Sequence, residues 1–163
     1  MRTPKDTVAI HDMHLCSKQD LDDINALLIA SRALIILNRR KYISSYIQAW
    51  IMHALGVGNG MLAIKNAYSN DTKLLSLFYI PLIFYCAFIG FNANDTSRAA
   101  KTEMRDCKDK YNSLKNVLQQ VTPPDIHNIA KIYRTEVPKD KEEEITIEAI
   151  QRALQYIMIK YQR

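Results

Sequence analysis

Two long stretches of the chain carry no charged side chain. The first, Tyr42–Ile64, has 23 residues, and the second, Leu74–Phe91, has 18. As α-helices they would measure about 34 Å and about 27 Å, close to the hydrocarbon thickness of a bilayer, about 30 Å. The first stretch is the less apolar of the two, because it also contains Ser44, Ser45, Gln48, His53 and Asn59. The pattern predicts a pair of membrane-spanning helices.

The segment between the two stretches is short, and basic residues lie outside them. Residues 65–73 leave room only for a turn, so the two spans are expected to form a hairpin with both ends on one side. Basic residues flank this hairpin: Arg39, Arg40, Lys41, Arg98, Lys101, Arg105, Lys108 and Lys110. Because basic loops are retained in the cytoplasm, we expect a multi-pass protein of the inner (cytoplasmic) membrane with both termini cytosolic.

A soluble helical bundle that buries the same two helices is the alternative interpretation. Pro81 lies inside the second stretch, and a proline in the interior of a soluble helix removes a hydrogen bond and clashes with the preceding turn. Helices in membranes accommodate proline more readily. The residue therefore favours the membrane interpretation.

Amphipathic helices are predicted on both sides of the hairpin. Residues 17–41 fit an entry helix with Ser17 as its N-cap and acidic residues in its first turn. In residues 92–121 the apolar positions are separated alternately by four and three, over about three heptads, as in a coiled-coil seam. These positions are Ala100, Met104, Cys107, Tyr111, Leu114, Leu118 and Val121. Pro123 and Pro124 end this helix.

Residues 122–163 are expected to form a C-terminal helical segment. A short helix would begin at an Asp125 cap, and Asp140 and Glu143 have the spacing of a capping box at the start of a last helix. Two interpretations of the heptad seams stay open: they pack on each other within one subunit, or they join subunits. In the second case the oligomer seam would be Met104, Tyr111, Leu114 and Leu118.

The chain is therefore expected to be an all-α protein in five parts. These are an N-terminal tail (1–16), an amphipathic entry helix (17–41), a two-helix transmembrane hairpin (42–91), a long cytosolic heptad helix (92–121) and the C-terminal helical segment (122–163).

Three of the four glycines, Gly56, Gly58 and Gly60, lie within five residues of the first span. A phosphate-binding loop is not predicted, because Met61 stands where GxGxxG needs its third glycine and Lys65 is out of register for a P-loop. Gly56 and Gly60 instead have the small-xxx-small spacing that lets membrane helices approach closely. They are the predicted helix-packing residues.

Three polar residues of the first span, Gln48, His53 and Asn59, are costly in hydrocarbon unless they face a partner or water. They would line a pore or an oligomer interface. The alternative is that they bond backbone carbonyls of the neighbouring span within one monomer.

No motif for catalysis or for cofactor binding is present. The sequence lacks GxSxG and HExxH motifs, and its three cysteines lack the spacing of a metal or redox site. The segment His11–Cys16 has two imidazoles and a thiol but no second pair at zinc-site spacing, so it is taken as a mobile tail without a signal-peptide core. We expect no enzyme, cofactor or metal. The net charge of +5 suits an anionic membrane at least as well as nucleic acid, and no nucleic-acid partner is expected.

The order of these parts resembles the SLATT family of small bacterial proteins with two transmembrane helices. The resemblance extends roughly from Leu27 to Gln120. It lies in "ASRALIILNRRKYISSYIQAWIM" at the entry to the first span, in the short hairpin, and in "RAAKTEMRDCKDKYNSLKNVLQQ", which includes Tyr111 and Leu114.

The resemblance implies an oligomeric membrane effector of a bacterial antiviral or conflict system that forms a pore. SLATT proteins often accompany an enzyme that makes a nucleotide second messenger, which implies a cytosolic nucleotide-signalling partner. Gly56 and Gly60 would pack neighbouring helices, and Gln48, His53 and Asn59 would wet the lumen. The alternatives are a non-conducting membrane scaffold that binds a cytosolic partner, and a soluble helical interaction module.

Overall fold

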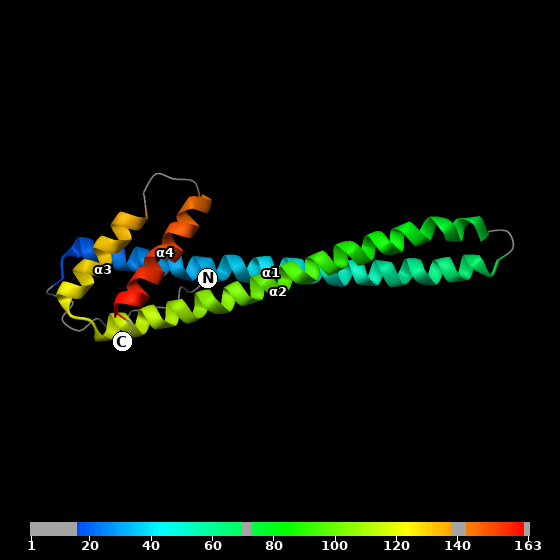
Figure 1. Cartoon of the computed structure of the whole chain (residues 1–163). Coiled ribbons are helices and arrows are strands. Elements are labelled where there is room, and N and C mark those ends of the chain that lie inside the picture. Colours follow the sequence, from blue (N-terminus) through cyan, green and yellow to red (C-terminus); the bar gives the residue numbers. More distant parts are fainter. Residues whose placement is uncertain (1–15, 70–72, 138–142, 162–163) are drawn as a thin grey trace. The chain divides into compact units, whose positions relative to one another are not determined.

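The computed structural model describes residues 16–69, 73–137 and 143–161, and all regular structure in these ranges is α-helical. The helices are α1 (Lys18–Ala67), α2 (Lys73–Gln120), α3 (Pro123–Glu136) and α4 (Glu143–Tyr161), as labelled in Figure 1. The predicted all-α class is confirmed. The segment His11–Leu15 and the predicted capping residue Asp140 lie outside the described residues.

Each of the first two helices runs through more than one of the predicted parts. α1 begins after Ser17, whose Oγ accepts a hydrogen bond from the backbone N–H of Asp20 at 3.1 Å, as expected for an N-cap. It then continues for 50 residues through the entry segment and the first uncharged stretch. α2 has 48 residues and contains Pro81 in its interior. Proline has no N–H to bond the carbonyl four residues earlier, here that of Leu77.

The third helix begins earlier than the sequence predicted. α2 ends at Gln120, before the two prolines, as expected. The N-cap of α3 is Thr122 and not Asp125, because proline at the first helical position costs no hydrogen bond and has a helical φ. Asp125 is the third residue of the helix, and its Oδ2 accepts hydrogen bonds from Thr122 Oγ1 at 2.7 Å and from the Thr122 N–H at 3.3 Å.

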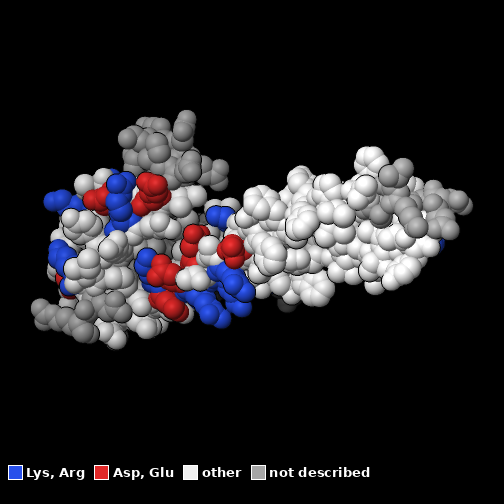
Figure 2. Space-filling model, turned by 45° about the vertical axis from the view of Figure 1, so that its right-hand side comes forward, with Lys and Arg blue, Asp and Glu red and all other residues white. Residues whose placement is uncertain are grey.

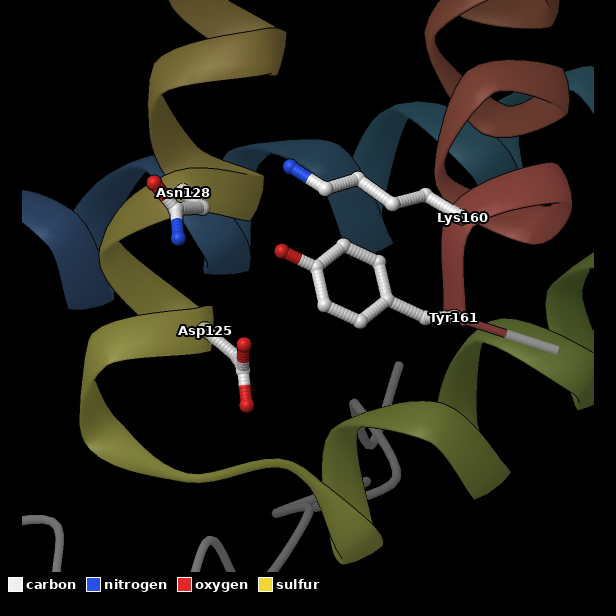
Figure 3. A pocket seen from close by; sticks show the side chains of 4 residues that line it. All are labelled: Asp125, Asn128, Lys160 and Tyr161. Atoms are coloured by element: carbon white, nitrogen blue, oxygen red, sulfur yellow. The ribbon is translucent and has the colours of Figure 1, made fainter. Parts of the chain in front are cut away.

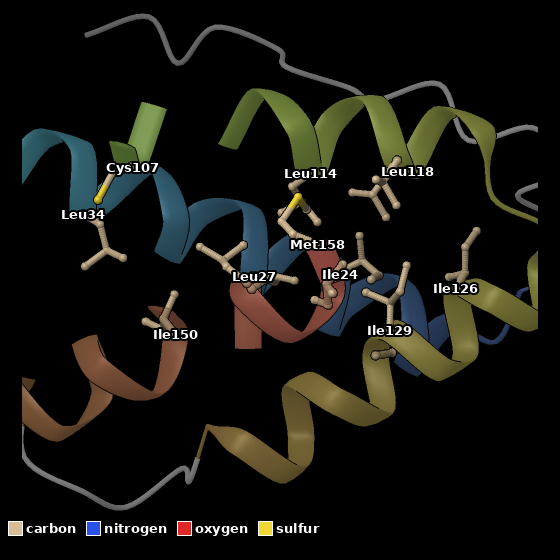
Figure 4. Close-up of a cluster of buried hydrophobic side chains, with 14 residues drawn as sticks. Ile24, Leu27, Leu34, Cys107, Leu114, Leu118, Ile126, Ile129, Ile150 and Met158 are labelled. Carbon is tan, nitrogen blue, oxygen red and sulfur yellow. The ribbon is translucent and has the colours of Figure 1, made fainter. Parts of the chain in front are cut away.

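The chain divides into two compact units. The bundle unit comprises residues 1–36 and 104–163, and the hairpin unit comprises Leu37–Glu103. In the bundle unit all four helices contribute to one core (Figure 4). Its fully buried large side chains are Ile24, Leu27, Leu114, Leu118, Ile126, Ile129, Leu154 and Ile157.

In the hairpin unit α1 and α2 run antiparallel, and three contacts fix their register. The Lys101 ammonium lies 5.9 Å from the centre of the Tyr42 ring. Further along, His53 lies against Gly90, and Gly56 lies against Cys86. Each step forward along α1 is thus matched by a step backward along α2.

Candidate membrane-facing surface and helix-packing seam

A seam of small residues lies between the two helices of the hairpin unit. On α2 the buried positions are separated alternately by four and three residues: Cys86, Gly90, Ala93, Ser97 and Ala100. On α1 Ala49 is buried, and a Cβ placed on Gly56 would lie 3.5 Å from the Cβ of Cys86. Small side chains allow close backbone approach, which is the usual way in which helices associate in lipid.

The heptad seam predicted from the sequence starts at Ala100. The same alternation continues toward the amino end of α2 through Ser97, Ala93, Gly90 and Cys86, but with small residues in place of large ones. Large apolar residues alone do not reveal the stretch from Cys86 to Ser97. The pattern becomes visible when small residues at heptad spacing are counted together with apolar ones.

Over residues 42–64 and 77–91, the outer surface of the hairpin unit consists largely of exposed apolar side chains. Trp50, Phe84 and Phe88 have exposed fractions of 63%, 71% and 66%, and large apolar side chains along both helices are exposed in the same way. The side of this unit seen in Figure 2 is white over most of its length, without the blue and red atoms of charged residues. A contiguous apolar surface of this kind is typical of a membrane or protein contact and is rare on a soluble monomer.

Within the described residues, α2 is the one helix that is long and apolar enough to cross a membrane. Its candidate segment begins at Leu77, and only 17% of the apolar window in it is buried, so the window does not resemble the core helix of a soluble protein. α1 falls short of the same test. The two-span hairpin predicted from the sequence is therefore supported for one helix only.

The three polar residues predicted to share one role lie on two sides of α1. The imidazole of His53 lies against α2: a Cβ on Gly90 would come within 2.9 Å of its ring, and the ring is nearly perpendicular to that of Phe91 at a centroid distance of 5.8 Å. Gln48 and Asn59 project from the opposite flank of the seam, where Gln48 is exposed and Asn59 is half-buried. The structure does not bring His53 together with the two amides.

The two glycines predicted to pack helices have different surroundings. Gly56 meets Cys86 in the seam, as described above. A Cβ on Gly60 would meet no atom within 4 Å, and the same holds for Gly58. Contact within the subunit therefore explains Gly56 and leaves the other two glycines unexplained.

The residues of the predicted oligomer seam lie in the bundle unit. Leu114 and Leu118 are fully buried in its core, while Met104 and Tyr111 are half-buried. Their neighbours in the core include Leu154 and Ile157 of α4. This is the packing within one subunit that the sequence left as one of two interpretations.

A polar cluster joins α1 to α3 inside the bundle unit. Arg134 donates hydrogen bonds to the carboxylates of Asp20 and Asp23, and the Nδ1 of His127 lies 3.0 Å from Oδ2 of Asp20. Burial raises the pKa of Asp20, but hydrogen bonds with His127, Ser17 and Arg134 together outweigh it, and the pKa lies below its usual value. The sequence shows only an acidic first turn, because His127 and Arg134 are more than 100 residues away from Asp20.

A polar pocket of about 410 Å³ lies between α3 and α4. It is lined by Asp125, Asn128, Lys160 and Tyr161, and the Tyr161 hydroxyl points toward α3 (Figure 3). That hydroxyl is buried and has no hydrogen-bond partner among the described residues. The pocket has one acid and one base and is not selective for an ion of either sign. No group of three or more metal-ligating side chains lies together in the described part of the chain.

A scan against protein-family models, a search of curated proteins and a search of solved structures each gave no match to this chain.

Proposed function

We propose that this protein is an integral membrane protein whose hairpin unit inserts into the bilayer as two spans. The observation that carries the proposal is the uncharged, exposed apolar surface of α1 and α2. Burying that surface in hydrocarbon removes it from water at a gain of about 25 cal/mol per Å². Both helices are continuous over this length, with one proline, Pro81, inside α2. A continuous helix bonds its backbone groups internally, as a bilayer requires.

α1 inserts as the partner of α2. On its own α1 is too polar to be a good span, but in the antiparallel pair Ala49 and Gly56 face α2 and not lipid. The imidazole of His53 is likewise partly covered by Gly90 and Phe91. Close approach through small residues lets α2 cover part of this imidazole, which lowers the cost of placing it in the bilayer.

The basic residues set the orientation. Arg39, Arg40, Lys41, Arg98 and Lys101 are exposed at the end of the hairpin unit that carries both chain connections to the bundle unit. Basic residues flanking a span remain on the cytoplasmic side. The protein then lies in the cytoplasmic membrane with the bundle unit and both termini in the cytosol.

The activity proposed for this arrangement is that of an oligomeric, pore-forming membrane effector of a bacterial conflict system. Two supports exist: the resemblance of the sequence to SLATT proteins, and the unsatisfied amides of α1, which need a polar partner in the bilayer. Two helices per chain cannot enclose an aqueous path, so conduction requires several copies. The second candidate is a non-conducting anchor, because the small-residue seam brings the two helices of one copy into close contact.

The first test is fractionation of cells that express the full chain, with a carbonate wash of the membranes. Retention in the washed membrane supports insertion, whereas extraction into the soluble fraction contradicts it. Purified protein is then incorporated into dye-loaded liposomes. Ion or dye flux that increases with the amount of incorporated protein supports the pore. Insertion without flux supports the non-conducting anchor.

A further inference from the structure

The two faces of α1 that do not contact α2 differ in chemistry. One, the lipid face, consists of exposed apolar residues: Ile43, Ile47, Trp50, Ala54, Val57 and Met61. The other, the amide face, contains two amides and a glycine: Gln48, Ile51, Leu55, Gly58, Asn59 and Leu62. A helix surrounded by lipid on both faces has no reason for this asymmetry.

The amides of this face are unsatisfied within the chain. Among the residues that the structure describes, neither Gln48 nor Asn59 makes a side-chain hydrogen bond. Across the hairpin from Asn59, the stretch of α2 between Leu77 and Phe91 has no amide, carboxylate or ammonium group, and its hydroxyls are those of Tyr79 and Tyr85. Inside a bilayer such groups must find a hydrogen-bonding partner.

The depth of the amides follows from the register of the hairpin. Since His53 lies opposite Gly90, Asn59 is level with Phe84, within the part of the pair where neither helix carries a charge. Gln48 is level with Asp95, where the charged residues of α2 begin. Asn59 is thus the amide that lies deepest in hydrocarbon.

Gly58 supplies an independent observation on the same face. A Cβ at this position would meet nothing within 4 Å, so no contact within the subunit requires a glycine. Glycine in a helix interior is unfavourable relative to alanine. Its presence is explained when another backbone approaches at this point.

We propose that a second copy of this chain packs against the amide face, with the two copies related by a two-fold axis along the membrane normal. This inference rests on the proposed insertion of the hairpin unit. Such an axis places every residue at the same depth in both copies, so Asn59 meets Asn59 and Gly58 meets Gly58. An amide is both donor and acceptor, and two copies satisfy each other.

Disulfide trapping in native membranes tests the face directly. Leu55→Cys places a thiol on the amide face, and Val57→Cys places one on the lipid face. The two parent residues have similar exposed fractions, 50% for Leu55 and 60% for Val57. The two positions lie about 160° apart around the helix at nearly the same depth. A membrane-permeable oxidant should give a disulfide-linked dimer of the Leu55→Cys chain and little of the Val57→Cys chain, above the background of the parent chain.

A glycine pair supplies the second measurement. A Cβ on Gly58 or on Gly60 would meet no atom of the subunit within 4 Å. The two glycines lie about 160° apart around α1, so Gly60 is outside the amide face and serves as the control. Gly58→Leu should raise the dissociation constant of the dimer in mild detergent roughly three- to tenfold, and Gly60→Leu should leave it unchanged. Equal trapping at both cysteines, or a loss of dimer with Gly60→Leu alone, overturns the proposal.

The carbonate-washed membrane fraction distinguishes a failure of this inference from a failure of the proposed function. If the protein is absent from carbonate-washed membranes, insertion itself fails. If it is present there but the Leu55→Cys chain stays monomeric under oxidation, insertion stands and the amide face is not a contact between copies. Trapping to a different membrane protein gives a band of another mass and also contradicts self-association.

Discussion

Two isoleucines of α4, Ile157 and Ile159, allow a sharp test of the bundle core. They are two residues apart in one helix, yet Ile157 is fully buried and Ile159 has an exposed fraction of 76%. Ile157 belongs to the core formed with α1, α2 and α3. The same substitution by alanine should therefore have very different effects at the two positions.

Ile157→Ala removes three carbon atoms from the core. Burial of each is worth about 0.8 kcal/mol, and the cavity left behind brings the usual cost of such a change to about 2–5 kcal/mol. A value of about 3 kcal/mol corresponds to an increase of about 150-fold in the open population of α4. Ile159→Ala loses little contact and should change that population less than about threefold.

Hydrogen exchange of the α4 amides in the full chain, in detergent, measures this population directly. The parent chain gives the reference rate, and the exposed Ile159→Ala variant is the matched control. If the two variants exchange at similar rates, α4 does not pack as described. If Ile157→Ala acts only at low protein concentration, this face joins subunits and does not fill the core of one.

Three further predictions concern the polar cluster, the seam and the basic residues. Because the pKa of Asp20 is lowered in the folded state, the polar cluster stabilises α3 at pH values above the unfolded-state pKa near 3.8. This stabilisation is lost as the pH falls through the lower folded-state pKa. The hydrogen-exchange protection of the α3 amides, corrected for intrinsic exchange, should therefore be constant from about pH 7 to about pH 5 and fall in acid. Gly56→Ala should be tolerated at its 3.5 Å contact, whereas Gly56→Leu should separate the helices and speed alkylation of Cys86 by a membrane-permeable maleimide. Replacing residues 39–41 by glutamine removes three basic residues at roughly 1 kcal/mol each, and should weaken binding to anionic vesicles about 150-fold. Binding to neutral vesicles should stay unchanged.

The helices themselves could be predicted because their signals are local. Ser17 caps the first helix within three residues of its partner, and the prolines after Thr122 stop the second helix through their own geometry. The choice of Thr122 over Asp125 as N-cap was missed, because both residues suit a cap and only the position of the prolines decides between them.

Contacts between helices were harder to predict. The link between Asp20 and Arg134 joins residues 114 positions apart, and no periodicity carries that information. The different surroundings of Gly56 and Gly60 also depend on the rotation of α1 against α2, which spacing of four residues does not fix. The separation of His53 from Gln48 is different: their spacing of five residues places them about 140° apart around α1, and the sequence already indicates two adjoining stripes.

The seam of small residues has a thermodynamic consequence for a protein with one part in water and one in lipid. The bundle core is stabilised by apolar burial from water, so its unfolding has a large positive heat capacity change and its stability falls on cooling below the temperature of maximum stability, about 10–20 °C. If the hairpin unit inserts as proposed, contact between Gly56 and Cys86 replaces lipid contacts and not water, so that source of curvature is absent. Cooling should therefore loosen the bundle unit while the paired helices keep their contact, and the two parts of one chain would lose structure at different temperatures.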